Sequence, residues 1–325
     1  MYSQFQKVIS LSQSTAILLK KLLLLFVFLP AFCVSQNYVD LLRIGYGQTF
    51  NNNFENSGSS TQVRSFEADL TFPVPLSEKN VLITGGAFSR NNLQLFPDAD
   101  FTSLLSTTLK LGLATTFNEK WSTTVVLLPK VASDYKNISG DDFYLGGFAL
   151  LKLKRSDRLI YRFGAYASTE AFGIFSTPII GWYYLSANGR FEMDMSLPIS
   201  ADLNYCLGAT TIGMDYFGIG RSFNITEDNS PEVYVDLSSL EFASYIQFNA
   251  LNKSVLLRAK FGYSSNDYEV YPQGQEIDFG LSAFSFGDDR TQLNPNVSGG
   301  LFLKFEAIYR FHLKQENDES NSPSE

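Results

Sequence analysis

The chain has 325 residues, of which 45% are hydrophobic, 15% aromatic and only 18% charged. Its formal net charge of −8 argues against a protein that binds nucleic acid or another polyanion, because such proteins present basic surfaces. No run of 18 or more apolar residues follows residue 34, which excludes a helical membrane protein.

The first 35 residues have the pattern of a secretory signal peptide. Three lysines and no acid accompany the apolar run 22–32, which is too short for a membrane-spanning helix. We expect cleavage after Ser35; lipidation at Cys33 is the alternative, disfavoured by the bulky Phe32 before it. Removing three lysines changes the net charge from −8 to −11 and leaves Cys206 as the sole cysteine, so no intramolecular disulfide can form.

Alternation of apolar and polar residues recurs from Val39 to Leu313. In the segment 105–117, Leu109, Leu111 and Leu113 share one face, and the opposite face carries polar or small residues. A period of two places these sets on opposite sides of a β-strand. We predict strands at 39–50, 62–74, 80–91, 103–117, 121–133, 142–154, 159–169, 175–185, 190–199, 209–223, 234–249, 254–265, 275–286 and 300–313.

Strand length separates the two fold classes that alternation allows, a secreted β-sandwich and a closed barrel. Strands of soluble proteins average about five or six residues. Most of the segments above have eleven or more, and about 9–11 residues cross a bilayer on a tilt. The sequence therefore predicts an all-β fold, an antiparallel transmembrane β-barrel of about 12–14 strands in meander order.

Short turns and long loops should mark the two rims of this barrel. Tight turns such as Ser77–Asn80 alternate with polar loops such as Asn51–Thr61 up to about residue 190, which is typical of bacterial barrels with periplasmic short turns. Beyond that point the alternation fails, so one strand is split or missed, and twelve strands remain an alternative to fourteen. We assign the barrel domain to residues 36–313 and expect the acidic tail 314–325 to be disordered.

Several segments support a resemblance to a known family. The run Phe279–Asn294 and the final Ala307–Phe311, together with Leu127–Lys130 and Leu197–Asp202, resemble an uncharacterised family of outer-membrane β-barrels from Gram-negative bacteria. The resemblance extends over nearly the whole mature chain. It implies the barrel and its location in the outer membrane, and, because the family is a domain of unknown function, it implies no activity.

Charged residues recur on the strand faces opposite the apolar ones. Lys or Arg on the lipid face near mid-bilayer costs about 2–4 kcal/mol, so these side chains should point into the lumen. They either line a water-filled pore and select solutes by charge, or pair across a narrow lumen and fill it. The candidates are Glu67, Asp69, Lys110, Lys152, Lys154, Arg162, Glu192, Asp194, Arg258, Lys260, Asp278, Lys304, Glu306 and Arg310.

Nothing in the sequence indicates an enzyme, a cofactor or a metal site. The single histidine, His312, has no accompanying nucleophile motif of the Gly-x-Ser-x-Gly type. Asp288, Asp289 and Arg290 lack the spacing of about six oxygen ligands that calcium requires, so we expect a local salt bridge or turn cap there.

We therefore predict a monomeric outer-membrane barrel, either a narrow pore for small solutes or a closed structural barrel. Its expected partners are outer-membrane lipid and the barrel-assembly machinery during insertion. A carrier of apolar molecules is one alternative, favoured by five apolar residues on faces interpreted as inward: Val126, Leu128, Phe148, Leu150 and Ile180. A protein that works in adhesion or assembly through its loops is another.

Overall fold

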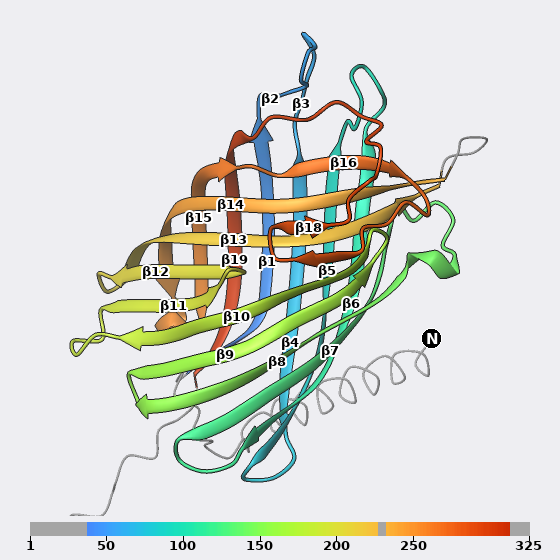
Figure 1. The fold of residues 1–325 in the computed structure, drawn as a ribbon. Helices are drawn as coiled ribbons and strands as arrows, with labels where there is room; N and C mark the ends of the chain where they lie inside the picture. The colour runs from blue at the N-terminus through green and yellow to red at the C-terminus, as the bar shows by residue number, and fades with distance from the viewer. Residues whose placement is uncertain (1–37, 227–231, 313–325) are drawn as a thin grey trace, which may run out of the picture. The chain divides into compact units, whose positions relative to one another are not determined.

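The computed structural model describes residues 38–226 and 232–312, so the predicted signal peptide and tail lie outside the described residues. The described residues form an all-β domain (Figure 1). No helix among them is long and apolar enough to cross a membrane. Fourteen strands make up its wall: β1 (Tyr38–Phe50), β4 (Arg64–Pro75), β5 (Asn80–Leu93), β6 (Thr102–Thr116), β7 (Trp121–Ser133), β8 (Phe143–Ser156), β9 (Leu159–Glu170), β10 (Gly173–Leu185), β11 (Phe191–Leu197), β12 (Ser200–Cys206), β13 (Thr210–Ile225), β14 (Val233–Ala250), β15 (Val255–Ser264) and β19 (Gly300–His312).

The wall strands form a closed ring in which each pairs antiparallel with its neighbours along the chain. The ring closes where β1 meets β19, with pairs from Tyr38↔His312 to Phe50↔Leu301. On its other edge β1 pairs with β4, from Leu42↔Leu70 to Gln48↔Arg64. The prediction of an antiparallel, meander-type barrel of about 12–14 strands is confirmed, with fourteen strands in the described part of the chain.

Two errors in the predicted strands cancel in the count. The segment 200–206 was not predicted, yet it forms β12 after a tight turn at Pro198 and Ile199. The segment 275–286 was predicted to cross the membrane, yet it holds only the short hairpin β17 (Phe279–Leu281) and β18 (Phe284–Phe286). Strands β11 and β12 have seven residues each, and their turn contains no glycine or asparagine to mark it. Adding β12 restores the alternation of rims that failed beyond residue 190.

The two rims differ in the length of their connections. Short turns join the strands at the rim that holds Tyr38 and His312, and one of them contains the 3-10 turn η2 (Leu251–Lys253). The opposite rim carries the long loops, apart from the tight connections after β9 and β11. Within those loops lie β2 (Asn52–Asn53), β3 (Ser60–Thr61), η1 (Gly140–Asp142), β16 (Asp267–Pro272), β17 and β18.

The outer surface of the ring is apolar. Leu109 is 61% exposed, Met214 63% and Phe305 60%, and each lies well inside a wall strand. A soluble protein would bury side chains of this size. An outward apolar band is what a barrel needs against acyl chains.

The long-loop end of the ring is closed from within by chain that leaves the wall. Residues 218–225 of β13 and 233–240 of β14, with β16, extend across the ring toward the opposite wall (Figure 1), and we call these three segments the plug. Asn224 of the plug forms a parallel bridge to Ser133 of β7, although β7 and β13 are not neighbours in the ring.

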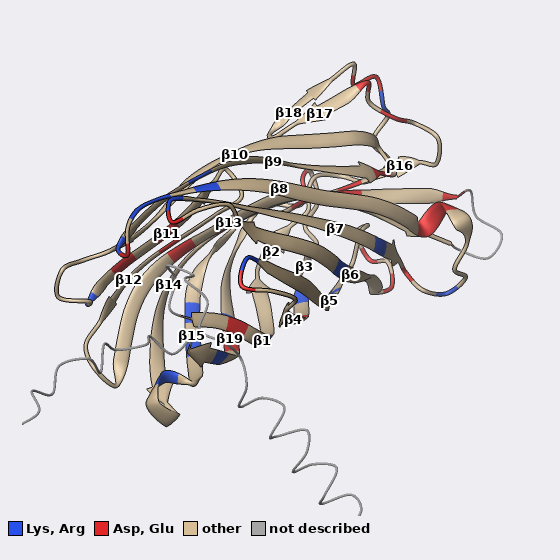
Figure 2. Cartoon of the chain, turned by 90° about the horizontal axis from the view of Figure 1, so that it is seen from below, with Lys and Arg blue, Asp and Glu red and all other residues tan. Residues whose placement is uncertain are grey.

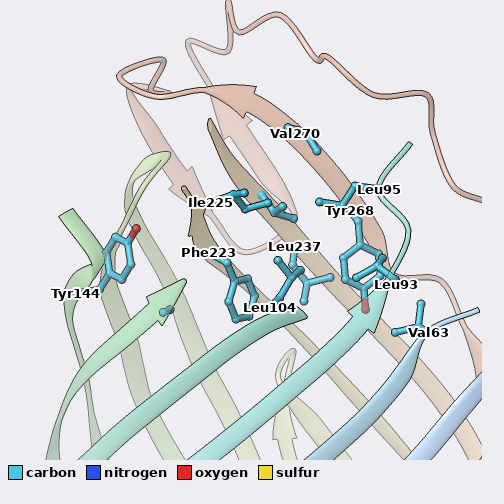
Figure 3. Close-up of a cluster of buried hydrophobic side chains, with 12 residues drawn as sticks. Val63, Leu93, Leu95, Leu104, Tyr144, Phe223, Ile225, Leu237, Tyr268 and Val270 are labelled. Carbon is cyan, nitrogen blue, oxygen red and sulfur yellow. The ribbon is translucent and has the colours of Figure 1, made fainter. Parts of the chain in front are cut away.

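A buried apolar cluster holds the plug to the opposite wall. Phe223 and Leu237 of the plug are fully buried against Leu93 of β5 and Leu104 of β6 (Figure 3). Burying a Leu or Phe side chain contributes about 1.5–3 kcal/mol. The plug is thus a packed element with the character of a protein core.

The apolar outer surface leads to a stability prediction. Leu109→Arg, at the centre of β6, should destabilise the folded barrel in lipid vesicles by about 2–4 kcal/mol, because the charge meets hydrocarbon. Urea unfolding followed by tryptophan fluorescence measures the loss. Leu207→Arg is the matched control: Leu207 is 58% exposed but lies in a rim turn, so the change there should be small. Equal, small effects at both positions would contradict a lipid-facing surface.

Candidate functional site

The interior of the ring holds a cavity of about 830 Å³. Its lining reaches the short-turn rim at Gly189 and Lys253. At the other end it stops against the plug and the wall behind it, at Phe223 and Ala132. The cavity is therefore open toward one rim and blind toward the other.

Most of the charged residues predicted to face inward lie on this cavity. Lys110, outside the lining, donates to Asp69 at 2.6 Å, and Lys152 is paired in register with Arg162. Lys154 reaches Asp157 in a rim turn at 2.7 Å. The ten candidates in the lining are Glu67, Asp69, Arg162, Glu192, Asp194, Arg258, Lys260, Lys304, Glu306 and Arg310.

Asp278 was assigned to the lumen wrongly. The strand on which it was placed does not cross the ring, and Asp278 is an exposed loop residue just before β17. The carboxylate of Asp278 packs against Gly287, so closely that a Cβ at Gly287 would clash with it. The Asp278 side chain therefore contacts its own loop and not the lumen.

Ile180 was also wrongly interpreted as inward. It is 59% exposed on the outer face of β10, whereas its neighbour Ile179 is 4% exposed and points in. In a run of consecutive apolar residues, as at Pro178–Gly181, the alternation that distinguishes the faces is lost. Leu128 and Val126 do lie on the inward side, the former in the cavity lining and the latter 3% exposed.

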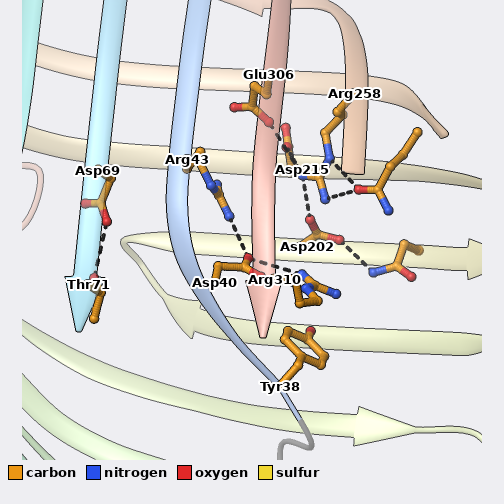
Figure 4. A network of polar contacts seen from close by, with 12 residues as sticks. Tyr38, Asp40, Arg43, Asp69, Thr71, Asp202, Asp215, Arg258, Glu306 and Arg310 are labelled. Carbon is orange, nitrogen blue, oxygen red and sulfur yellow. Dashed lines mark hydrogen bonds and ion pairs between the residues drawn. The ribbon is translucent and has the colours of Figure 1, made fainter. Parts of the chain in front are cut away.

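Arg258 on β15 is the centre of the largest charge network (Figure 4). Its guanidinium lies 3.2 Å from Asp202, 3.6 Å from Asp215 and 3.8 Å from Glu306. It also stacks at 3.9 Å over the ring of Tyr245, whose hydroxyl donates to Asp202. The side chain of Arg258 is only 6% exposed, so these three acids replace most of the water it would otherwise bind.

Two lysines extend the same network along the wall. Lys260 lies 2.5 Å from Asp215 and 3.2 Å from Glu306. Lys304 donates to Glu67 at 2.7 Å and lies 4.0 Å from Glu241. The pairs link β4, β13, β14, β15 and β19, so the charges tie together strands on both sides of the ring closure.

A second network lies nearer the short-turn rim. Arg310 donates to Asp40 at 2.6 Å and stacks at 3.5 Å over the ring of Tyr38 (Figure 4). The Tyr38 hydroxyl donates to Glu192 at 2.6 Å. These contacts join β1 and β19 to β11, which lies next to β10 in the ring.

Strands β7, β9 and β11 contribute further pairs that point into the same space. Arg162 of β9 donates to Asp194 of β11. Lys130 of β7 donates to Glu170 at 2.6 Å, and Glu170 accepts from the backbone and hydroxyl of Ser222 at the plug, both at 2.8 Å. One charge pair therefore fixes the plug to the wall.

Among the arginines that line the cavity in the described part of the chain, Arg221 is distinguished by a buried nitrogen, its Nε, that has no hydrogen-bond partner. Nor does any acid in the described part of the chain form an ion pair with its guanidinium within 4.0 Å. Arg221 therefore presents a positive charge to the cavity at its blind end.

Sequence reasoning missed several cavity charges, including Asp202, Asp215 and Arg221. Asp202 was missed because β12 was not predicted. Asp215 lies between Met214 and Tyr216 in a predicted strand, so the alternation that revealed Glu67 marks it equally well. Pairing across the ring carries no such signal, because Arg258 and Asp202 are 56 residues apart.

The segment around Arg290 forms the local ion pair predicted for it. Arg290 donates to Asp288 at 2.9 Å and holds the pKa of that carboxyl below its ordinary value. It also donates at 2.9 Å to Asp236 of the plug and stacks at 4.0 Å over Tyr271. The side chain is 3% exposed, so the loop after β18 is fixed onto the plug.

A closed antiparallel ring, apolar outside and charged inside, defines the class of transmembrane β-barrels. The chain belongs to the family described as "Domain of unknown function (DUF6268)", which matches residues 33–212. The family resemblance inferred from the sequence is thereby confirmed, over a shorter part of the chain than the sequence suggested: Leu127–Lys130 and Leu197–Asp202 lie within the match, whereas Phe279–Asn294 and Ala307–Phe311 lie outside it. No curated protein matches the sequence.

Solved outer-membrane proteins cover most of the chain at low similarity. An outer-membrane channel from Pseudomonas putida F1 is 10% identical with a TM-score of 0.34, over 84% of this chain and 95% of that one. The NanC porin is 9% identical with a TM-score of 0.31, over 82% and 98%. The TodX monoaromatic hydrocarbon channel is 11% identical with a TM-score of 0.32, over 85% and 91%. The fold assignment rests on the strand pairings of the chain itself.

The Arg258 network leads to a second stability prediction. Arg258→Ala should destabilise the barrel by about 3–5 kcal/mol, because it leaves buried acids without their counter-charge. Arg43→Ala is the control, since Arg43 is 44% exposed and its pair with Asp40 at 3.5 Å should contribute less than about 1 kcal/mol. Both are measured by urea unfolding in vesicles, and equal losses would contradict the central role of Arg258.

Proposed function

We propose that this protein is a gated channel of the bacterial outer membrane for small polar solutes, and that the structure represents its closed state. The observation that carries the proposal is the charge-lined cavity of about 830 Å³, open at one rim and ended by the plug. With short turns on the periplasmic side, the open mouth faces the periplasm and the plug closes the outer side.

The lining favours polar solutes over apolar ones. Among the described residues it contains nine acids and ten bases. Removing so many charges from bulk water is unfavourable, so they are better explained by a hydrated passage than by a need for stability. A purely structural barrel would instead be filled by packed side chains, as small barrels are.

Charge selectivity should be weak. Acids and bases in the lining are nearly equal in number, and most form pairs at 2.5–4.0 Å, so their fields largely cancel. Arg221 at the blind end, which forms no ion pair with the described acids, favours anions slightly.

The plug has the features of a gate. It joins the wall at Gly218 and Gly220 on β13, and glycines within a strand permit a bend there. The last antiparallel pair between β12 and β13 is Ser200↔Phe217, immediately before these glycines. The plug can therefore swing while the lower ring stays paired.

Planar-bilayer conductance tests the proposal. In a first variant a two-residue Asn-Gly turn replaces residues 219–239, joining the register partners Gly218 and Leu240. It should give a steady current, whereas the wild type should be closed most of the time. Resistance of the folded form to SDS at room temperature checks that the barrel is intact. A folded but silent variant would overturn the channel and leave the closed structural barrel.

A reversible lock provides the matched control. Asn224→Cys with Ser133→Cys, in a Cys206→Ser background, places two thiols at the bridge between the plug and β7. Oxidation should abolish the brief openings of the wild type, and reduction should restore them. Equal currents in the oxidised and reduced forms would show that solutes do not pass the plug.

A further inference from the structure

The barrel wall is incomplete between β10 and β13. Strands β11 and β12 have seven residues each, fewer than the ~9–11 that cross a bilayer. β10 pairs with β11 only from Ile180 onward, and β13 pairs with β12 only up to Phe217. Toward the long-loop rim, residues 173–179 and 218–225 have no ring strand between them in the described part of the chain. We call this opening the gap.

The β17–β18 hairpin covers the gap from outside. β17 adds to the free edge of β10 in parallel, with the pairs Phe175↔Gly280 and Ser176↔Leu281. Figure 1 shows the hairpin between β10 and β13, and Figure 2 shows it standing off the wall beside β10.

The attachment of this hairpin is small compared with the seams of the ring. Its backbone attachment consists of two residue pairs, flanked by hydrogen bonds from Ile277 N to Phe172 O and from Ser282 N to Ser176 O, both 2.9 Å. The contact between the hydroxyls of Thr177 and Ser282 and the packing of Ile277 against Phe175 add to it. Every seam between ring neighbours pairs six residues or more. The hairpin can therefore leave the wall without breaking the ring.

The outer face of the hairpin is apolar. Phe284 is 68% exposed, Phe286 52% and Phe279 37%. Three exposed phenylalanines within eight residues suit contact with acyl chains, as do the neighbouring exposed residues of β10, such as Ile174 at 57%. The hairpin thus lies at the level of the bilayer.

A single aromatic side chain lies between the hairpin and the cavity. Phe175 is 5% exposed and fits between two glycines: a Cβ at Gly280 would be 3.1 Å from its ring, and one at Gly220 3.5 Å. Its ring contacts Tyr166 and Phe172 at centroid distances of 6.2 and 6.4 Å. Tyr166 and Gly220 also line the cavity, so one ring separates the cavity from the cover.

We propose that the gap is a lateral portal through which apolar molecules, of the cross-section of an aromatic ring or an acyl chain, pass between the bilayer and the cavity. The β17–β18 hairpin is its cover and Phe175 its inner barrier. This function goes beyond the polar channel, because it uses a different opening and a different class of solute. The rings of Tyr166, Phe172 and Phe175 recognise the passing molecule by stacking and apolar contact.

A cysteine placed behind the cover tests the portal. Ile219 lies in the cavity lining and packs against the Phe175 cluster, so Ile219→Cys in a Cys206→Ser background puts one thiol at the inner side of the gap. The probe is N-dodecylmaleimide dissolved in the vesicle bilayer, and the readout is its labelling rate by mass spectrometry. We expect labelling within minutes to hours.

Locking the cover should slow this labelling at least tenfold. The hydroxyls of Thr177 and Ser282 are 2.6 Å apart, so Thr177→Cys with Ser282→Cys forms a disulfide between β10 and the hairpin turn. Reduction should restore the rate, which is read on the peptide that contains residue 219 because the reduced thiols at positions 177 and 282 also react. Phe175→Ala should raise the N-dodecylmaleimide labelling rate several-fold. If the alanine variant does not fold, Phe175→Leu is used in its place.

Two controls separate the portal from general access. A water-soluble sulfonated maleimide should label the thiol introduced by Ile219→Cys at the same rate in the locked and unlocked forms, since it arrives through the cavity. Ser89→Cys, in the lining on β5, should be insensitive to the lock toward both reagents. Equal N-dodecylmaleimide rates with and without the lock, no labelling of the Ile219→Cys variant at all, or equal slowing of both reagents would overturn the portal. None of these outcomes depends on ion conduction.

Discussion

The structure depends on one constraint, that backbone N–H and C=O groups within hydrocarbon must all pair with each other. A sheet satisfies it only by closing on itself, since a free edge would expose unpaired groups to lipid. The pairing of β1 with β19 meets this requirement along twelve residues. Where the wall is incomplete, above β11 and β12, the same constraint explains why β17 pairs with the free edge of β10.

The interior follows from the exterior. Once alternate residues face lipid, the others must face each other, and a ring of this size is too wide for side chains to fill it uniformly. This protein divides the space into a charged part and an apolar part. Acids and bases around Arg258 and Arg310 face the cavity, and the cluster around Phe223 and Leu237 closes its end. Glu170 joins the two parts, because it binds Lys130 of the wall and Ser222 of the plug.

The sequence predicts the fold well because alternation is a local signal. Segments such as 105–117 identify a strand and its two faces without knowledge of any partner. The signal fails where strands are short, as at β11 and β12, and where an amphipathic run such as 275–286 is long enough to resemble a membrane strand. Most of the cavity charges were predictable for the same reason, whereas their partners were not, since register and ring closure determine which acid meets Arg258.

The plug and the gap have no signature in the sequence. Phe223 shares the inward face of β13 with Asp215, and Leu237 shares the inward face of β14 with Tyr245, so alternation marks both as inward. It does not show that they pack against Leu93 and Leu104 of the opposite wall. The parallel pairing of β17 is equally invisible, because Phe175 and Gly280 are more than a hundred residues apart and share no pattern. Both features arise from long-range packing, which the alternation of a single strand does not encode.

The position of the closing seam also determines the order of assembly. Tyr38 and His312 come from opposite ends of the described chain, yet they are register partners. Contacts this distant in sequence make folding slow, because the loop entropy is lost before the pairing compensates for it. The last strand must therefore emerge before the cylinder can be sealed, and until then the edges of β1 and β15 that pair with β19 have no partner in the ring.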